Sequence, residues 1–366
     1  MKTAALLLLT ALRPCTPLLP PSSSPSLTFP RSTSLFSSSS ATSTKVSATE
    51  VSINPLVASV KMSKTVEIFG LVKSMEAAGE AVTSLCVGEP DFPPPAAVIE
   101  ATVAAVRNGQ TTYTAVTGTQ ELRSAIANDL LRRKGVEYDS KTEILVSNGA
   151  KQAVFQAVLA LAGPGDEVLI PSPYWPSYPE MVLLAGATPV IVPTTLENGF
   201  LLQPEDLRRH LTDKTKCMIF CNPSNPSGAV HSESLMRELA KVLEEHDGEG
   251  EGRSKVAVVS DEIYERLLYN EENPHKSFAG LPNMFSRTLT VNGFSKAYAM
   301  TGMRLGYLAG PARLVKPCVT IQSQLTSCAS SISQAAGVAA LEGVEEVEME
   351  GNVEIMRKKR DFVVER

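Results

Sequence analysis

The sequence is poor in the residue patterns that hold metal ions or form disulfides. Its four histidines are scattered along the chain, and its six cysteines include no Cys-x-x-Cys pair, whereas zinc sites place such ligands a few residues apart. Cys217 and Cys221 lie four residues apart in an apolar run, so on a strand they share one face but lie too far apart to bridge. We therefore expect no metal site, and reduced, mostly buried thiols.

Nucleotide-binding glycine loops and a basic net charge are also absent. Segment 149–151 lacks the Gly-Lys-Ser/Thr sequence of a P-loop, and no glycines have the dinucleotide-binding spacing. The formal net charge of −5 disfavours nucleic acid as a main partner. These absences exclude the common classes of nucleotide-binding protein. The 366 residues exceed one ordinary domain and can bury a large core.

The first 49 residues contain no Asp or Glu. They hold four basic residues and 20 Ser or Thr, a composition typical of an organelle transit peptide that takes no part in the fold. The apolar run 4–12 is similar to the core of a secretory signal and is too short to span a membrane. An organelle and the secretory pathway both remain open as destinations, and a two-part plastid signal would satisfy both observations.

What the sequence does contain is a series of short apolar runs, each ending in polar groups. The runs lie at 144–147, 167–170, 217–221 and 256–259, and helix-like stretches at 152–162 and 232–245 stand between some of them. Apolar runs of this length are typical of strands buried on both faces. Their alternation with helices predicts the α/β class with a mostly parallel sheet, in which ligands bind beyond the carboxyl ends of the strands.

Lys296 is the most informative of the polar groups. It stands among small residues just past another apolar run. A single lysine is usually solvated, yet a lysine at a strand end can form a Schiff base with a carbonyl. Gly149, Ala150 and Lys151 open a helix whose free N–H groups suit a phosphate, and Arg304 can clamp that phosphate with paired hydrogen bonds.

Four further side chains suit a flat cationic ring. Trp175 offers a face for stacking. Asp261 ends a buried run, where an anion needs a cationic partner, and a protonated pyridine nitrogen is such a partner and makes the ring an electron sink. Asn225 and Tyr264 can donate hydrogen bonds to a ring oxygen. Each of these side chains taken singly has an ordinary structural explanation, but together with Lys296 they specify pyridoxal 5'-phosphate.

Seven motifs in the same order resemble the class I, fold-type I aminotransferases. Within these the chain is most similar to the bacterial-type aspartate aminotransferases, including plastid enzymes that also transaminate prephenate. The motifs lie at 87–92, 112–123, 149–151, 172–178, 222–228, 260–265 and 291–307, and the resemblance extends over about 54–366. It implies a mostly parallel central sheet with helices on both faces, plus a small domain.

The resemblance also divides the chain into segments. It implies a targeting peptide at 1–49, the N-terminal segment of a small domain at 50–80, a large cofactor-binding domain at 81–345, and the start of the C-terminal small domain at 346–366. The family continues beyond Arg366 and supplies an arginine for the substrate α-carboxylate that this chain does not match. We therefore expect either part of a working enzyme or a truncated, inactive cofactor-binding remnant.

Roles toward the cofactor follow from the same resemblance. Lys296 is similar to the Schiff-base lysine that also moves the substrate proton, and Asp261 to the partner of the ring nitrogen. Tyr264 and Asn225 resemble the ligands of the ring oxygen, and Trp175 the stacking residue.

The phosphate and substrate contacts are implied in the same way. Gly149, Ala150, Lys151 and Arg304 resemble the phosphate cup, and Tyr113 the tyrosine that reaches the phosphate of a neighbouring subunit, which implies a homodimer. The expected substrate contacts are Gly88 and Asn225 near the α-carboxylate, Lys151 and Thr65 near a distal carboxylate, and Trp175.

The expected activity is transamination between aspartate or glutamate and a 2-oxo acid such as 2-oxoglutarate or oxaloacetate. Prephenate is a further expected acceptor, and the route passes through a Lys296 aldimine and a quinonoid. An aromatic or alanine aminotransferase remains the alternative. The resemblance favours the plastid, with a mitochondrial or secretory destination left open, and it implies no membrane partner.

Overall fold

The structure is a computed structural model that describes residues 52–86, 88–248, 255–269 and 274–366. The expected targeting peptide, 1–49, lies outside the described residues. Residues from Ser52 onward form one compact unit. No helix in the described part of the chain is long and apolar enough to cross a bilayer.

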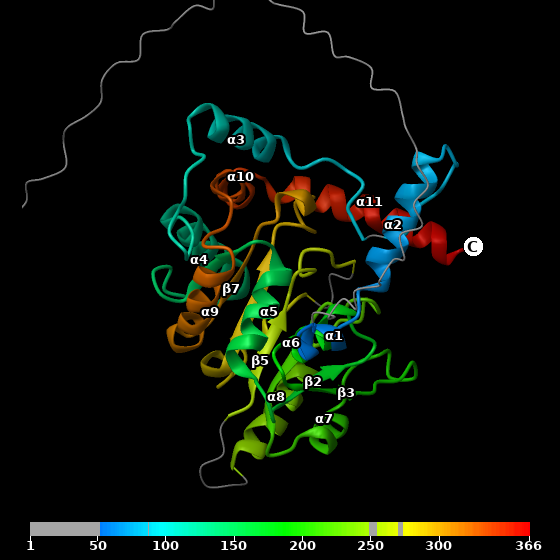
Figure 1. The fold of residues 1–366 in the computed structure, drawn as a ribbon, viewed down its shortest axis with the longest axis vertical. Helices are drawn as coiled ribbons and strands as arrows, with labels where there is room; N and C mark the ends of the chain where they lie inside the picture. Colours follow the sequence, from blue (N-terminus) through cyan, green and yellow to red (C-terminus); the bar gives the residue numbers. More distant parts are fainter. Residues whose placement is uncertain (1–51, 87, 249–254, 270–273) are drawn as a thin grey trace, which may run out of the picture. The chain divides into compact units, whose positions relative to one another are not determined.

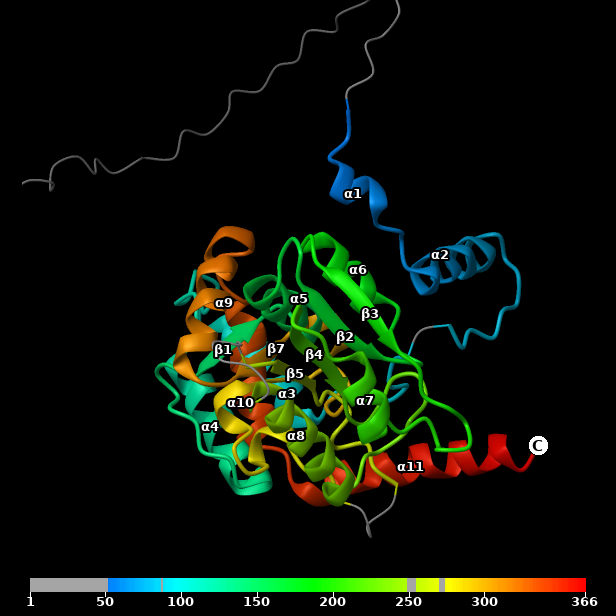
Figure 2. The ribbon, with the colours of Figure 1, turned by 90° about the horizontal axis from the view of Figure 1, so that it is seen from below.

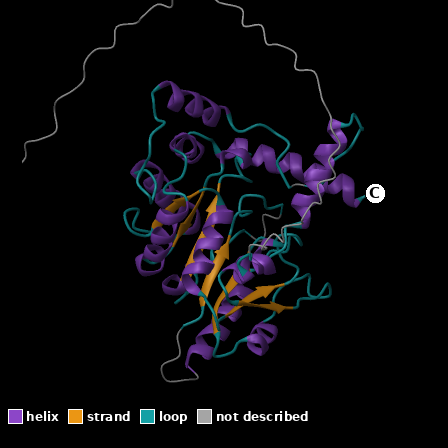
Figure 3. Cartoon of the chain, in the orientation of Figure 1, coloured by secondary structure: helices purple, strands orange, loops and turns teal. Residues whose placement is uncertain are grey.

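A seven-stranded sheet forms the centre of the described unit (Figures 1 and 3), in the order β1-β7-β6-β5-β4-β2-β3. Only β7 runs antiparallel to its neighbours, and all other adjacent pairs are parallel. The prediction of a mostly parallel α/β sheet is confirmed. The strands are β1 (Ile144–Ser147), β2 (Glu167–Pro171), β3 (Thr188–Val192), β4 (Thr215–Cys221), β5 (Ala257–Asp261), β6 (Thr288–Gly293) and β7 (Gly306–Ala309).

Helices cover both faces of this sheet. One face packs against α5 (Ala150–Leu161), α6 (Ser177–Leu184) and α9 (Ala312–Leu325). The opposite face packs against α7 (Pro204–His210) and α8 (Glu233–Gly248), and near β1 and β7 against α4 (Gln120–Lys134) and α10 (Ser331–Glu342). Helix α3 (Ala96–Arg107) packs on α10. Figure 2 shows α5 and α8 on opposite sides of the strands.

Three further helices and three short 3₁₀ turns complete the described part of the chain. They are α1 (Pro55–Ser59), α2 (Lys64–Ala77) and α11 (Glu346–Val364), with short 3₁₀ turns at Phe278–Gly280, Phe285–Arg287 and Thr301–Met303. The expected helices at 152–162 and 232–245 are confirmed as α5 and α8. Strands β3 and β7, by contrast, were not among the expected apolar runs.

Strand β4 explains why the apolar runs look nearly continuous. Cys217 and Ile219 belong to the core beneath α5 and α6, whereas Met218 and Phe220 belong to the core beneath α8. Successive strand residues point to opposite faces, so both faces of the sheet are filled and neither set of positions is free to be polar.

The cysteines in the described part of the chain are free thiols, as predicted. Cys217 and Cys318 are buried, and Cys86, Cys221 and Cys328 are partly buried. Burial raises the pKa of the Cys217 thiol to about 12, so this thiol stays protonated and behaves as a small apolar side chain.

Candidate functional site

The polar groups expected to form the site lie along one edge of the sheet. Strands β1, β2, β4, β5 and β6 are parallel, so their carboxyl ends meet at this edge. Because β7 is antiparallel to β6, its beginning lies at the same edge. That reversal is what brings Arg304, two residues before β7, into line with groups that follow the other strands.

Arg304 lies against the start of α5. Gly149, the residue before the helix, has a φ of 87° and makes no side-chain cap. A β-carbon at Gly149 would lie 2.7 Å from Arg304 Nη2, so only glycine allows the guanidinium this close. Arg304 also donates from Nη1 to the Thr301 carbonyl at 2.9 Å. Uncapped helix N–H groups beside an arginine form an anion-binding site.

Lys151, in the first turn of α5, adds a second cation. Its Nζ lies 5.2 Å from the centre of the Trp175 ring, within range of a cation–π contact. Burial lowers the pKa of Lys151, and the positive charge of Arg304 lowers it further. The structure therefore brings Gly149, Ala150, Lys151, Arg304 and Trp175 together.

Asp261 is the last residue of β5 and is buried, with 4% of its surface exposed. Its Oδ2 accepts a hydrogen bond from the Tyr178 hydroxyl at 2.6 Å, and its Oδ1 accepts one from the Ile263 N–H at 3.3 Å. Burial raises the pKa of Asp261 to about 6, although both hydrogen bonds oppose this rise. A buried carboxylate in this state favours a cationic ligand.

Tyr264 and Asn225 form a pair beside Asp261. The Asn225 Nδ2 donates to the Tyr264 hydroxyl oxygen at 3.0 Å. Burial raises the pKa of the Tyr264 phenol, with a further contribution from the negative charge of Asp261. The hydroxyl therefore stays protonated and keeps one hydrogen to donate to a ligand.

Lys296 follows β6 by three residues and is partly buried rather than solvated. Its Nζ donates to the Gly88 carbonyl at 2.5 Å. Burial lowers the pKa of this ammonium; Glu89 opposes the effect and Arg304 adds to it. A lowered pKa increases the fraction of neutral amine, which is the form that attacks a carbonyl.

Two expected site residues stand apart from this group. Thr65 lies exposed in the first turn of α2, and 90% of the Tyr113 surface is exposed. Among the described residues, no hydrogen bond or ion pair joins either side chain to Lys296 or Asp261. Their expected roles stay predictions.

Two residues at the site had no role in the sequence analysis. Tyr178 contacts Asp261, and Glu89 raises the pKa of Lys296. Both stand inside motifs that carried the family resemblance. A tyrosine three residues after Trp175 was the available signal, but only the tertiary structure shows that its hydroxyl meets Asp261.

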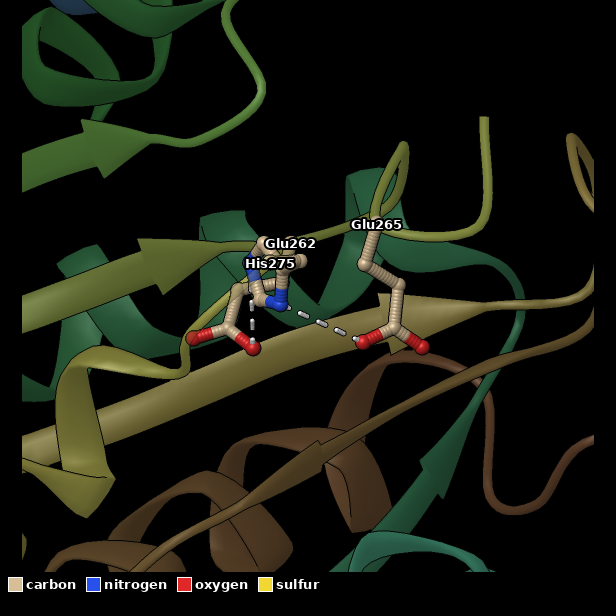
Figure 4. A group of neighbouring side chains, drawn as sticks. All are labelled: Glu262, Glu265 and His275. Atoms are coloured by element: carbon tan, nitrogen blue, oxygen red, sulfur yellow. Dashed lines mark ion pairs between the residues drawn. The ribbon is translucent and has the colours of Figure 1, made fainter. Parts of the chain in front are cut away.

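A second buried group of charges lies after β5, formed by Glu262, Glu265 and His275 (Figure 4). These side chains have a geometry that could hold a metal ion, which the sequence analysis did not anticipate. Both carboxylates already have cationic partners, because Lys134 Nζ lies 2.5 Å from Glu262 Oε2 and also pairs with Glu265. Arg133 Nη2 lies 2.5 Å from Glu265 Oε1.

The charge states follow from these contacts. Burial by itself would raise the pKa of Glu265, but Lys134 and Arg133 hold it well below its ordinary range. Burial lowers the pKa of His275, so the neutral ring donates from Nε2 to the Asn222 carbonyl at 3.1 Å. We interpret the group as an ion-pair network that fixes the segment following Asp261.

Residues 80–366 match the family model described as aminotransferase class I and II. A Petunia hybrida protein named bifunctional aspartate aminotransferase and glutamate/aspartate-prephenate aminotransferase is 51% identical over 317 residues, covering 86% of this chain and 64% of the relative. A Pinus pinaster aspartate aminotransferase is 50% identical over 322 residues, covering 87% and 63%. The chain thus spans less than two thirds of the length of these curated relatives.

The fold has a solved counterpart as well. The structure of aspartate aminotransferase from Thermus thermophilus with maleate superposes with a TM-score of 0.81 at 38% sequence identity, over 86% of this chain and 80% of that one. This likeness confirms the expected fold-type I architecture.

Proposed function

The chain belongs to the class I and II aminotransferases, and from this premise we propose that it transfers an amino group between aspartate or glutamate and a 2-oxo acid such as 2-oxoglutarate or oxaloacetate. The observation that carries the proposal is the convergence of Lys296, Asp261 and the Arg304–Gly149 pair at one edge of the sheet. This set joins an amine nucleophile, a buried carboxylate and an anion site.

Pyridoxal 5'-phosphate fits this set of residues. The approach of Arg304 to Gly149 leaves no room for a β-carbon and presents a guanidinium and free helix N–H groups to a phosphate. Asp261 has no ion-pair partner among the described residues and has a raised pKa, as expected of a carboxylate prepared for a pyridinium. Trp175 would stack on the ring, and Tyr264 with Asn225 would bind its oxygen.

The chain's own residues then have defined tasks. When bound, the cofactor supplies an electron sink for the substrate Cα. Asp261 keeps the ring nitrogen protonated, which maintains that sink. Lys296 would hold the cofactor through Nζ, and its free amine would accept the substrate Cα proton and return it. Its lowered pKa favours the neutral base.

Lys151 supports an acidic substrate. Its ammonium lies over Trp175, beside the expected ring position, where it would pair with a distal carboxylate. Gly88 and Asn225 would contact the α-carboxylate, and Thr65 would contribute on the distal side. The names of the Petunia and Pinus relatives and the maleate of the Thermus thermophilus structure support dicarboxylates, with prephenate as a further acceptor.

Assembly and location complete the proposal. The exposed Tyr113 is free to reach a neighbouring subunit, which supports a homodimer with shared sites. The acid-free, Ser- and Thr-rich segment 1–49 supports delivery to a plastid. Sedimentation of the purified chain and imaging of a fusion of residues 1–49 to a fluorescent protein would test these two points separately.

The activity is tested by visible absorption of the purified chain loaded with pyridoxal phosphate. We expect a protein-bound band that bleaches with aspartate and returns with 2-oxoglutarate. A band that ignores aspartate would refute amino transfer, and no bound band would refute cofactor binding. Lys296→Ala should abolish cofactor attachment that survives borohydride reduction and denaturation, whereas Lys316→Ala, at an exposed lysine on α9, should retain it.

A further inference from the structure

Tyr178 contacts two of the residues assigned to the cofactor ring. It is the second residue of α6, and 2% of its surface is exposed. Its hydroxyl donates to Asp261 Oδ2 at 2.6 Å. Its ring meets Trp175 edge-on, with centroids 5.4 Å apart and planes at 88°, a favourable aromatic geometry.

We propose that Tyr178 is a positioning residue that holds the Asp261 carboxylate where it would meet the cofactor ring nitrogen and the Trp175 ring where it would meet the cofactor ring face. This role rests on the proposed cofactor, and Tyr178 would support cofactor binding without touching the cofactor ring itself. One side chain thereby couples the residue at the ring nitrogen to the residue at the ring face.

The hydrogen bond has one possible direction. Burial raises the pKa of the Tyr178 phenol well above its ordinary value, and the neighbouring Asp261 charge raises it further. The hydroxyl therefore remains protonated and donates to the carboxylate. Because Oδ2 is engaged by Tyr178 and Oδ1 only by a long bond from Ile263, Oδ1 keeps capacity for a second donor such as a pyridinium N–H.

The other groups near Asp261 do not stabilise its charge in this way. Glu262 raises the pKa of Asp261 by repulsion. Cys221, at the end of β4, is a neutral thiol whose pKa is raised to about 12 by burial and by Asp261. The Tyr264 hydroxyl accepts a hydrogen bond from Asn225 and makes none with Asp261 among the described residues, and burial raises its pKa. Tyr178 is thus the side chain that opposes the effect of burial on Asp261.

Tyr178→Phe separates the two contacts, because it removes the hydroxyl and keeps the ring beside Trp175. The measurement is the affinity of the apoprotein for pyridoxal phosphate, followed by absorption across a pH series. We expect the affinity to fall about tenfold or more, the range of a lost hydrogen bond to a charged group. As the pH is lowered, the affinity of Tyr178→Phe should begin to fall at a higher pH than that of the wild type, because Asp261 would protonate more readily.

A cofactor analogue with CH in place of the ring nitrogen isolates the mechanism. This analogue cannot pair with Asp261, so wild type and Tyr178→Phe should bind it with nearly equal affinity. Tyr138→Phe is the matched control, because Tyr138 is also buried and its hydroxyl bonds Thr290 Oγ1 at 3.2 Å, away from the site. It should bind both ligands as wild type does.

Each outcome decides between the hypotheses. Equal affinity of wild type and Tyr178→Phe for pyridoxal phosphate would overturn the positioning role, and so would an equal loss with the analogue, because that would indicate general loosening. Failure of the wild type to bind pyridoxal phosphate would overturn the proposed function and this inference with it. If Tyr178→Phe folds poorly by circular dichroism, Tyr178→His and Tyr178→Ala are compared instead. Tyr178→His retains a ring donor and should bind pyridoxal phosphate more tightly than Tyr178→Ala.

Discussion

Arg304 and Gly149 approach each other so closely that a β-carbon on Gly149 would lie 2.7 Å from the arginine Nη2. The glycine has a φ of 87°, in the region where L side chains are strained. The backbone conformation thus favours glycine at the start of α5, and a β-carbon there would displace the guanidinium from its place beside the uncapped helix N–H groups.

Gly149→Ala should therefore weaken both folding and phosphate binding. Backbone strain and displacement of Arg304 should lower the free energy of unfolding by about 1–3 kcal/mol. Denaturant unfolding and the affinity for pyridoxal phosphate measure the two effects. Gly163→Ala is the control, because no atom lies within 4 Å of its β-carbon. Equal behaviour of the two variants would refute the close-approach argument.

Asp261 should make the apoprotein less stable as the pH rises from about 4 to about 6. Its pKa is about 6 in the folded protein against an ordinary value of 3.8, so across this window the folded state binds more protons than the unfolded chain. The free energy of unfolding should fall by about 2–3 kcal/mol and then level off. Asp261→Asn, measured by denaturant unfolding at several pH values, should remove this decline.

Cofactor binding should offset that loss, because a pyridinium at Asp261 favours the ionised carboxylate. Stabilisation by pyridoxal phosphate should therefore be larger above pH 6 than below pH 5 in the wild type. The pH series repeated with saturating cofactor tests this. A pH-independent stabilisation would contradict the assignment of Asp261 to the ring nitrogen.

Lys134 should be critical for stability although it lies outside the site. Its side chain is 2% exposed and pairs with Glu262 and Glu265. Lys134→Met removes the cation that both buried carboxylates share and should lower the free energy of unfolding by about 3–5 kcal/mol. Lys241→Met, at a 75%-exposed lysine paired with Glu245 at 3.8 Å, should cost less than about 1 kcal/mol. Chemical denaturation compares them, and similar values would refute the network's structural role.

Lys151 should decide the preference for acidic substrates. Lys151→Ser should lower kcat/KM for aspartate about 10- to 100-fold, the range of one lost charge-assisted hydrogen bond, and leave alanine or phenylalanine turnover nearly unchanged. Lys141→Ser, at an exposed lysine, is the control. A variant that kept its preference for aspartate would show that other residues recognise the distal carboxylate.

The sequence alone predicted the fold class, which the structure confirms, and the residues that we propose bind the cofactor. Buried parallel strands require continuous apolar runs, and the chemistry of this site requires specific side chains just beyond them, so Lys296, Asp261 and Asn225 stood in recognisable places. Motif spacing carried this information because each motif is local: a strand end, a turn and a few following residues.

The tertiary structure decided how these local pieces meet. The antiparallel course of β7 brings Arg304 to the edge where the other strands end, and the packing of α6 places the Tyr178 hydroxyl 2.6 Å from Asp261. Lys134 meets Glu262 across 128 positions of sequence. No local pattern encodes such contacts, because they depend on strand order and helix packing, which arise only when distant segments share one core.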